Sequence, residues 1–124
     1  MAGTIVADTI QDGAGNSTAM DNAIYGSAKA WVNYNAISKS IRASYNVSSV
    51  TYTTTGTYVV NFTNALPSAN YNVVCSCSND STTVGFGGFY QSLASPTTTS
   101  ATMYSVQYTS ALRDYPYFCA SFFN

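Results

Sequence analysis

Hydrophobic and polar residues alternate with a period of two along most of the chain after residue 29. The clearest alternation lies in residues 41–48, where Ile41, Ala43, Tyr45 and Val47 are expected to face inward and the residues between them outward. Such alternation is typical of β-strands that bury one face. Weaker stretches of the same kind occupy residues 30–35, 50–52, 58–62, 71–77, 102–108 and 117–123.

Turn-forming residues separate these stretches. A Thr-Thr-Thr-Gly sequence lies at 53–56, a longer connection with a proline lies at 64–70, and a Ser-Asn-Asp-Ser sequence lies at 78–81. About eight short strands with turns every 8 to 12 residues are typical of a sandwich. We therefore predict an all-β fold in which residues 29–124 form an antiparallel β-sandwich or jelly-roll-like domain.

Residues 1–28 differ from the rest of the chain, because they are rich in Ala, Gly, Asn and Asp. One short stretch, 20–25, could form a helical turn. A segment of this composition cannot bury a core of its own, and an ordered terminus needs contacts that hold it. We therefore predict an extended N-terminal arm that docks on a neighbouring subunit or on another protein of the same assembly. Its apolar anchors are Ile5, Val6, Ile10 and Ile24.

The chain is unusually poor in charge. Only 7% of its residues are charged, whereas an average soluble domain has about 25%. A surface with so little charge is suited to burial against copies of itself, so we expect a homo-oligomer, and a trimer in particular. The net charge is −1 and the four cations, Lys29, Lys39, Arg42 and Arg113, do not cluster. This distribution argues against nucleic-acid binding, which depends on clustered cations.

The N-terminal residues have neither the basic start nor the apolar run of a signal peptide, and no stretch of the sequence is apolar enough to cross a membrane. The protein is therefore expected to be made in a cytoplasm and to insert into no membrane.

The residue types needed for catalysis are scarce. The sequence contains no His and no Glu, and its Asp residues fall mostly in the N-terminal segment and in turns, where Asp usually forms turns or caps. No serine has a nearby lysine in a spacing used for nucleophilic catalysis. We therefore predict that the protein is not an enzyme and needs no cofactor.

The three cysteines are expected to be free, partly buried thiols. Cys75 and Cys77 lie two residues apart on a predicted strand, so their Cα atoms should be roughly 6.7 Å apart on one face. That separation suits a disulfide poorly. Metal binding by this pair with Cys119 is the alternative, but without histidine the ligand set would be limited to these thiols.

Aromatic residues near turns in the C-terminal half are the candidates for surface recognition. Tyrosine rings stack on sugars and contribute to interfaces at low entropy cost. We select Tyr90, Tyr115 and Tyr117, together with Asn79, in the predicted loops 78–81, 90–96 and 112–117. The alternative interpretation is that these rings fill the core and the contacts between subunits.

Four segments carry a resemblance to a known group of proteins. They are KAWVNYN at 29–35, IRASYNVSSV at 41–50, YVVNFT at 58–63 and ALPSANY at 65–71. In order and spacing they resemble tail and fibre-type structural proteins of tailed bacteriophages. The similarity covers residues 29–71, about a third of the chain. It departs from the usual pattern at 36–40, where AISKS replaces a glycine-rich turn.

The resemblance implies a virion component, usually homotrimeric, with a β-rich distal module and no catalytic residues. The leading hypothesis is a virion surface structural protein, namely a tail-fibre-like or tail-associated host-attachment module that contacts a host-surface glycan. A capsid decoration or cement protein is the first alternative. A soluble sugar-binding module is the second.

Overall fold

In a computed structural model of the protein, strands form most of the chain. The structure describes residues 3–79, 87–89, 96–107 and 109–124. In chain order its elements are β1 (Thr9–Gln11), β2 (Ser17–Ala19), α1 (Met20–Gly26), β3 (Ala30–Asn35), β4 (Ser40–Tyr45), β5 (Val47–Thr54), β6 (Thr57–Phe62), β7 (Asn72–Ser78), β8 (Gly87–Phe89), β9 (Ser100–Gln107) and β10 (Tyr117–Phe123).

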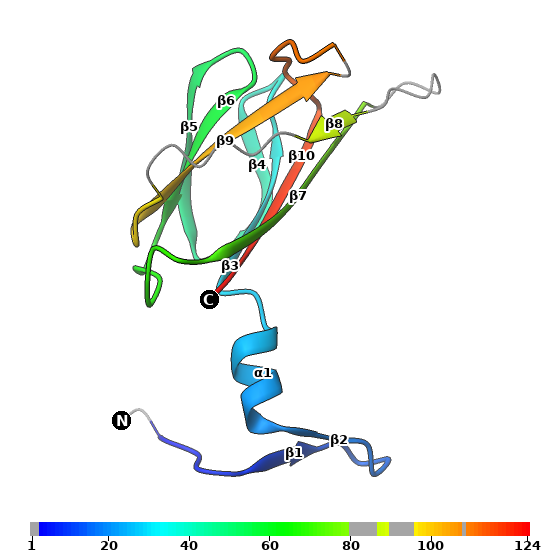
Figure 1. Cartoon of the computed structure of the whole chain (residues 1–124), viewed down its shortest axis with the longest axis vertical. Helices are drawn as coiled ribbons and strands as arrows, with labels where there is room; N and C mark the ends of the chain where they lie inside the picture. Colours follow the sequence, from blue (N-terminus) through cyan, green and yellow to red (C-terminus); the bar gives the residue numbers. More distant parts are fainter. Residues whose placement is uncertain (1–2, 80–86, 90–95, 108) are drawn as a thin grey trace.

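Two four-stranded antiparallel sheets form the main body in a sandwich-like arrangement (Figure 1). The strand order is β4-β3-β10-β7 in one sheet and β5-β6-β9-β8 in the other. The chain passes from the first sheet to the second between β4 and β5, at Asn46, whose φ of 53° is in the left-handed region. The prediction of an all-β, antiparallel fold is confirmed.

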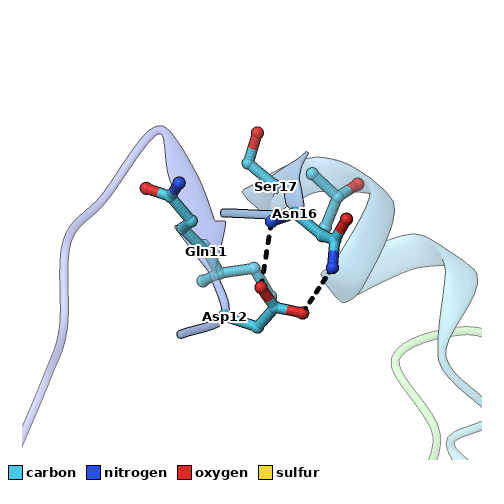
Figure 2. A pocket seen from close by; sticks show the side chains of 6 residues that line it. Gln11, Asp12, Asn16 and Ser17 are labelled. Carbon is cyan, nitrogen blue, oxygen red and sulfur yellow. Dashed lines mark hydrogen bonds between the residues drawn. The ribbon is translucent and has the colours of Figure 1, made fainter. Parts of the chain in front are cut away.

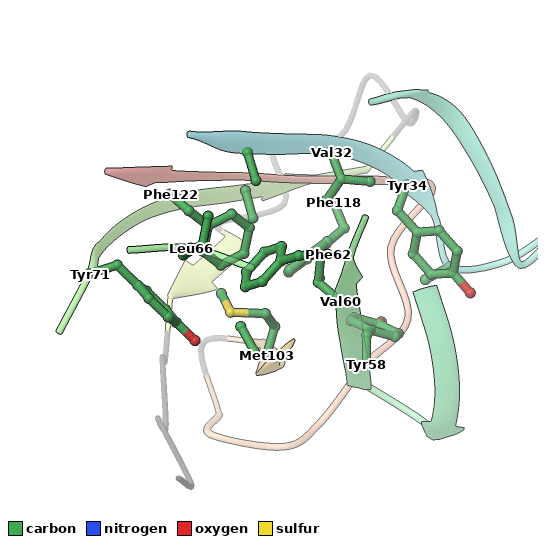
Figure 3. Packing of buried hydrophobic residues seen from close by; sticks show 14 residues of the cluster. Val32, Tyr34, Tyr58, Val60, Phe62, Leu66, Tyr71, Met103, Phe118 and Phe122 are labelled. Atoms are coloured by element: carbon green, nitrogen blue, oxygen red, sulfur yellow. The ribbon is translucent and has the colours of Figure 1, made fainter. Parts of the chain in front are cut away.

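The core lies between the two sheets and is lined with aromatic rings (Figure 3). Phe62 and Phe122 meet edge to face with ring centroids 5.0 Å apart, and Tyr34 and Tyr58 do so at 5.4 Å. Edge-to-face pairs at such distances are favourable beyond the area that they bury. The alternation at 30–35 and at 58–62 predicted these inward positions correctly, because both strands are covered by the opposite sheet.

The prediction that Ile41, Ala43 and Tyr45 face inward is wrong, because these residues lie in β4 and are exposed. All six residues of β4 are exposed, including Ile41 and Tyr45. β4 is the edge strand of its sheet, and a bulge between Asn33 and Tyr34 shifts its pairing with β3. The positive φ of Asn46 then turns the chain, so that only Val47 packs against the core.

In β9 the buried residues are not those that the alternation at 102–108 indicated, which are Thr102, Tyr104 and Val106, but the residues between them. Ala101, Met103 and Ser105 face the core, whereas Thr102 and Tyr104 are half-buried on the other side of the strand. The apolar residues of this strand therefore contribute to two faces.

The N-terminal residues lie outside the sandwich. β1 and β2 pair as a hairpin, and α1 connects that hairpin to β3. Figure 1 shows α1 extending past the end of the sandwich at which the C-terminus lies. The helical turn predicted at 20–25 is confirmed by α1. The docking of this segment on a neighbour stays a prediction.

Candidate functional site

The outer face of the β4-β3-β10-β7 sheet carries a row of exposed apolar side chains. Tyr45 pairs with Trp31, Trp31 with Ser121, and Ser121 with Val74, so these four residues form one row across all four strands. Tyr45 is 58% exposed and Val74 is 59% exposed, and Trp31 is exposed as well. Ser121, the small residue of the row, lies between Trp31 and Val74. We call the surface formed by Tyr45, Trp31, Ser121 and Val74 the open face.

Few charges lie near the open face. Arg42 is the sole charged residue in the four strands of this sheet. Its guanidinium lies over the Tyr117 ring, 4.2 Å from the centroid, and donates to the Pro116 carbonyl oxygen. Cys119 and Ser76, which pair with each other next to the central row, are small. The open face is therefore a mainly apolar row, and the strands that carry it contain one charged side chain, that of Arg42.

The N-terminal segment, residues 3–28, exposes the apolar anchors expected from the sequence. Val6 is 93% exposed and Ile5 is 87% exposed, and Ile10 and Ile24 are exposed too. None of the four lies in the buried core cluster. These four side chains therefore add nothing to the core of the sandwich, and the segment consists of the β1–β2 hairpin and α1.

The turn of the N-terminal hairpin is held by Asp12 (Figure 2). Its carboxylate accepts hydrogen bonds from the backbone N–H groups of Ala14 and Asn16, both at 2.9 Å, and from the Asn16 side chain at 2.8 Å. The hydrogen bonds from Asn16 lower the pKa of the Asp12 carboxyl. Asp12 therefore has the role of a turn former, as predicted for most of the aspartates.

A second aspartate organises the opposite end of the sandwich. The Asp114 carboxylate accepts hydrogen bonds from the Tyr52 hydroxyl at 2.8 Å, the Gly56 N–H at 2.7 Å and the Tyr58 hydroxyl at 3.0 Å. The Tyr58 hydroxyl also lies 2.9 Å from Ser105 Oγ. Burial, with the nearby Asp114 carboxylate, raises the pKa of Tyr58. We call Tyr52, Gly56, Tyr58, Ser105 and Asp114 the Asp114 cluster.

The Asp114 cluster combines a serine, two tyrosines and a carboxylate, but its geometry is that of a structural network. Tyr58 and Ser105 are fully buried, so a substrate could not reach their hydroxyls. Ser105 Oγ donates to the Arg113 carbonyl oxygen at 2.5 Å, which uses its proton. The cluster therefore fastens the chain around residues 113–114 to the β5–β6 turn.

The predicted recognition residues have different positions. Tyr115 is only 2% exposed and its ring is part of the interior, so the expectation that it forms a surface site is wrong. Its hydroxyl points to the Val106 carbonyl oxygen at 3.4 Å. Tyr117 is 40% exposed, with its ring stacked against Arg42, and Asn79 is half-buried. Tyr90 lies outside the described residues, as does most of the predicted loop 90–96.

None of the three cysteines, all of which lie within the described residues, forms a disulfide. Cys75 and Cys77 lie on the core side of β7 and pack against the core, whereas Cys119 is half-buried on the outer side of β10. Burial raises the pKa of the Cys77 thiol to about 11 and also raises that of Cys75. Both thiols are therefore protonated at neutral pH and weakly nucleophilic.

In the part of the chain that the structure describes, His, Cys, Asp and Glu form no group that could hold a metal ion. Within that same part, no helix has the length and apolar character needed to span a membrane.

Two features of these surfaces could not be found from the sequence alone. The open face needs the strand register, because Trp31, Ser121 and Val74 are far apart in the chain. The Asp114 cluster needs the fold to bring Asp114 to Gly56. The one local signal for the Asp114 cluster was the Thr-Gly turn at 55–56, because the backbone N–H of Gly56 needs a hydrogen-bond acceptor if it is buried.

In comparisons with protein-family models, with curated proteins and with solved structures, none matches this chain.

Proposed function

We propose that the protein is a non-enzymatic structural protein of a tailed-phage virion surface, and that it acts as a tail-associated host-attachment module. The observation that carries the proposal is the division of the chain into two parts with opposite properties. The sandwich buries an aromatic core of its own, while residues 3–28 expose Tyr25 and all four of their branched aliphatic side chains. A part that folds alone joined to a part that needs a partner is the design of an assembling subunit.

The resemblance of residues 29–71 to tail and fibre-type proteins gives the assembly its proposed identity. The resembling segments contain β3, most of β4 and β6, and the first half of β5. They therefore supply strands to both sheets of the sandwich, and the resemblance concerns the scaffold of the domain.

The attachment role is supported by the arrangement of the two ends. The N-terminal segment lies past one end of the sandwich, and the β5–β6 turn lies at the other (Figure 1). If the N-terminal segment contacts the virion, the end with the β5–β6 turn and the Asp114 cluster faces outward. Loops held on a rigid scaffold are frequent sites of recognition. Tyr117, with an exposed ring beside Arg42, is the described residue best suited to stack on a sugar of the host surface.

A capsid decoration protein is the second candidate, and the burial of Tyr115 favours it. That burial removes one of the rings expected to serve recognition. A protein that covers a capsid needs an assembly contact but no receptor site. The soluble sugar-binding module, the third hypothesis, would need no partner for the N-terminal segment.

Quantitative mass spectrometry of purified particles separates these functions. The particles are those of the phage that encodes the chain, and a known capsid protein is the internal standard. The proposal expects the chain in the particles at a few copies each, and immunogold labelling at the tail. Hundreds of copies on the capsid would replace attachment by decoration. Absence from particles that retain all their other structural proteins would refute both virion functions.

A further inference from the structure

We propose that the N-terminal segment of one copy of this chain docks on the open face of a second copy. The inference rests on the assembly role proposed above and names the partner in that assembly. The contact would join the apolar anchors Ile5 and Val6 to the strip around Trp31 and Val74. Three lines of argument support this pairing.

The first argument is apolar complementarity. The open face presents a ring, a small residue and a branched aliphatic residue in one row, namely Trp31, Ser121 and Val74. The N-terminal segment presents two adjacent aliphatic side chains, Ile5 and Val6, that are almost fully exposed. Among the described residues both surfaces keep apolar area in water, with Trp31 38% and Val74 59% exposed, and burying the two surfaces against each other removes apolar area from water on both.

The second argument is charge. Residues 1–28 contain Asp8, Asp12 and Asp21 and neither Lys nor Arg, which gives a side-chain charge of −3. Residues 29–124 contain four cations and two aspartates, which gives +2. One of these cations is Arg42 on the sheet that carries the open face. A segment with three carboxylates therefore meets a sheet whose one charged side chain is a cation, which favours this encounter over that of segment with segment.

The third argument is direction. Figure 1 shows the hairpin beyond the end of its own sandwich, so the open face of the same copy is not its neighbour. Each copy gives one segment and receives another, and such a head-to-tail contact can close into a ring, a trimer included.

Two variants of the full chain test the pairing. The segment variant carries Ile5→Ser and Val6→Ser. The face variant carries Trp31→Thr and Val74→Thr, since threonine preserves strand propensity. Circular dichroism and thermal unfolding check that both fold. Ile37→Thr, which changes an exposed apolar residue outside the open face, is the matched control. Sedimentation velocity over a range of concentrations measures the association of each protein.

The proposal expects each variant to raise the dissociation constant at least about 10-fold, a loss expected when anchor residues are truncated. The control should leave it unchanged. An equimolar mixture of the two variants should recover a heterodimer, because the face variant retains an intact segment and the segment variant retains an intact face. Failure of the mixture to associate, when each variant is folded, would show that the segment and the face are not partners.

Trp31 provides an independent readout, because it is the only tryptophan of the chain. Docking on the open face should shift its emission to the blue as the concentration rises, and the segment variant should lose that shift. A blue-shifted emission that does not change on dilution, in a protein that sediments as a monomer, would mean that the segment docks within its own copy and would overturn docking between copies. These experiments use the purified protein, so the docking proposal can be refuted while the chain is still found in virions. The docking proposal can also hold for a chain that is absent from virions.

Discussion

The Asp114 cluster and the neighbouring Tyr34 permit one chemical change to be tested at two buried sites. Tyr58 and Tyr34 are both fully buried, and their rings touch. The Tyr58 hydroxyl bonds to Asp114, whereas in the described part of the chain the buried Tyr34 hydroxyl has no hydrogen-bond partner. Replacing each tyrosine by phenylalanine removes one oxygen and preserves the ring.

The two substitutions are expected to have different effects. Tyr58→Phe removes a hydrogen bond to a carboxylate, which is worth about 1.5 to 3 kcal/mol. Asp114 keeps its bonds from Tyr52 and the Gly56 N–H, and Ser105 Oγ, which loses its contact with Tyr58, keeps its bond to the Arg113 carbonyl oxygen, so the loss should stay within that range. Tyr34→Phe removes a hydroxyl that gains nothing from the fold, so the free energy of unfolding should stay the same or rise by up to about 1 kcal/mol. For a chain of this length the Tyr58→Phe loss corresponds to a melting temperature lower by roughly 5–12 °C.

Urea unfolding followed by far-UV circular dichroism measures both effects. The variants are compared at equal protein concentration, because association stabilises the folded state. A change of the midpoint with an unchanged slope reports stability alone. Equal destabilisation by the two substitutions would refute the assignment, because it would mean that Tyr34 has a bond of the same value. A Tyr58→Phe loss below about 0.5 kcal/mol would show that the Asp114 cluster does not stabilise the fold.

Three further predictions follow from the packing. Gly56→Ala should lower the free energy of unfolding by about 2–4 kcal/mol, since Gly56 has a φ of 65° and an added Cβ would lie 2.6 Å from the Ser105 carbonyl oxygen. The control is Gly26→Ala, whose added Cβ would meet no atom within 4 Å, and equal losses of stability in thermal unfolding would contradict the prediction. Cys77 should react slowly with a thiol reagent at pH 8, because its pKa is about 11, and rapid labelling of the folded chain would contradict this burial. Tyr115→Ala should lower the free energy of unfolding by about 3–5 kcal/mol, because it removes a buried ring, whereas Tyr117→Ala should lower it much less and, if the attachment proposal holds, should weaken adsorption of particles. Equal destabilisation in urea unfolding would contradict the first expectation, and unchanged adsorption would contradict the second.

The sequence pattern predicted strands well where the opposite sheet covers them. β3 and β6 bury alternate residues as expected, because each pairs on both sides within its sheet and faces the other sheet. β4 has the clearest alternation of all and is exposed along its whole length. Alternation records that one face of a strand is apolar, but it does not reveal whether that face is covered by the same chain.

The candidate surfaces depend on the arrangement of strands, which the sequence does not reveal. Trp31 and Val74 lie in one row, on either side of Ser121, because β10 lies between β3 and β7. That order joins the last strand to two earlier ones and has no local signature. The anchors of the N-terminal segment could be selected without the fold, because Ile5, Val6, Ile10 and Ile24 are its only branched aliphatic residues. The docking of that segment stays a prediction.

Native mass spectrometry of the full chain at micromolar concentration tests the central claim, that this subunit assembles with copies of itself, most directly. We expect a mass that is a multiple of 13.2 kDa, with three copies as the predicted number. A chain lacking residues 1–24 should fold, by circular dichroism, because none of the described residues 3–24 lies in the core cluster. It should remain a monomer, because it lacks the segment proposed to dock on a second copy. A full chain that stays at 13.2 kDa under the same conditions would contradict the claim.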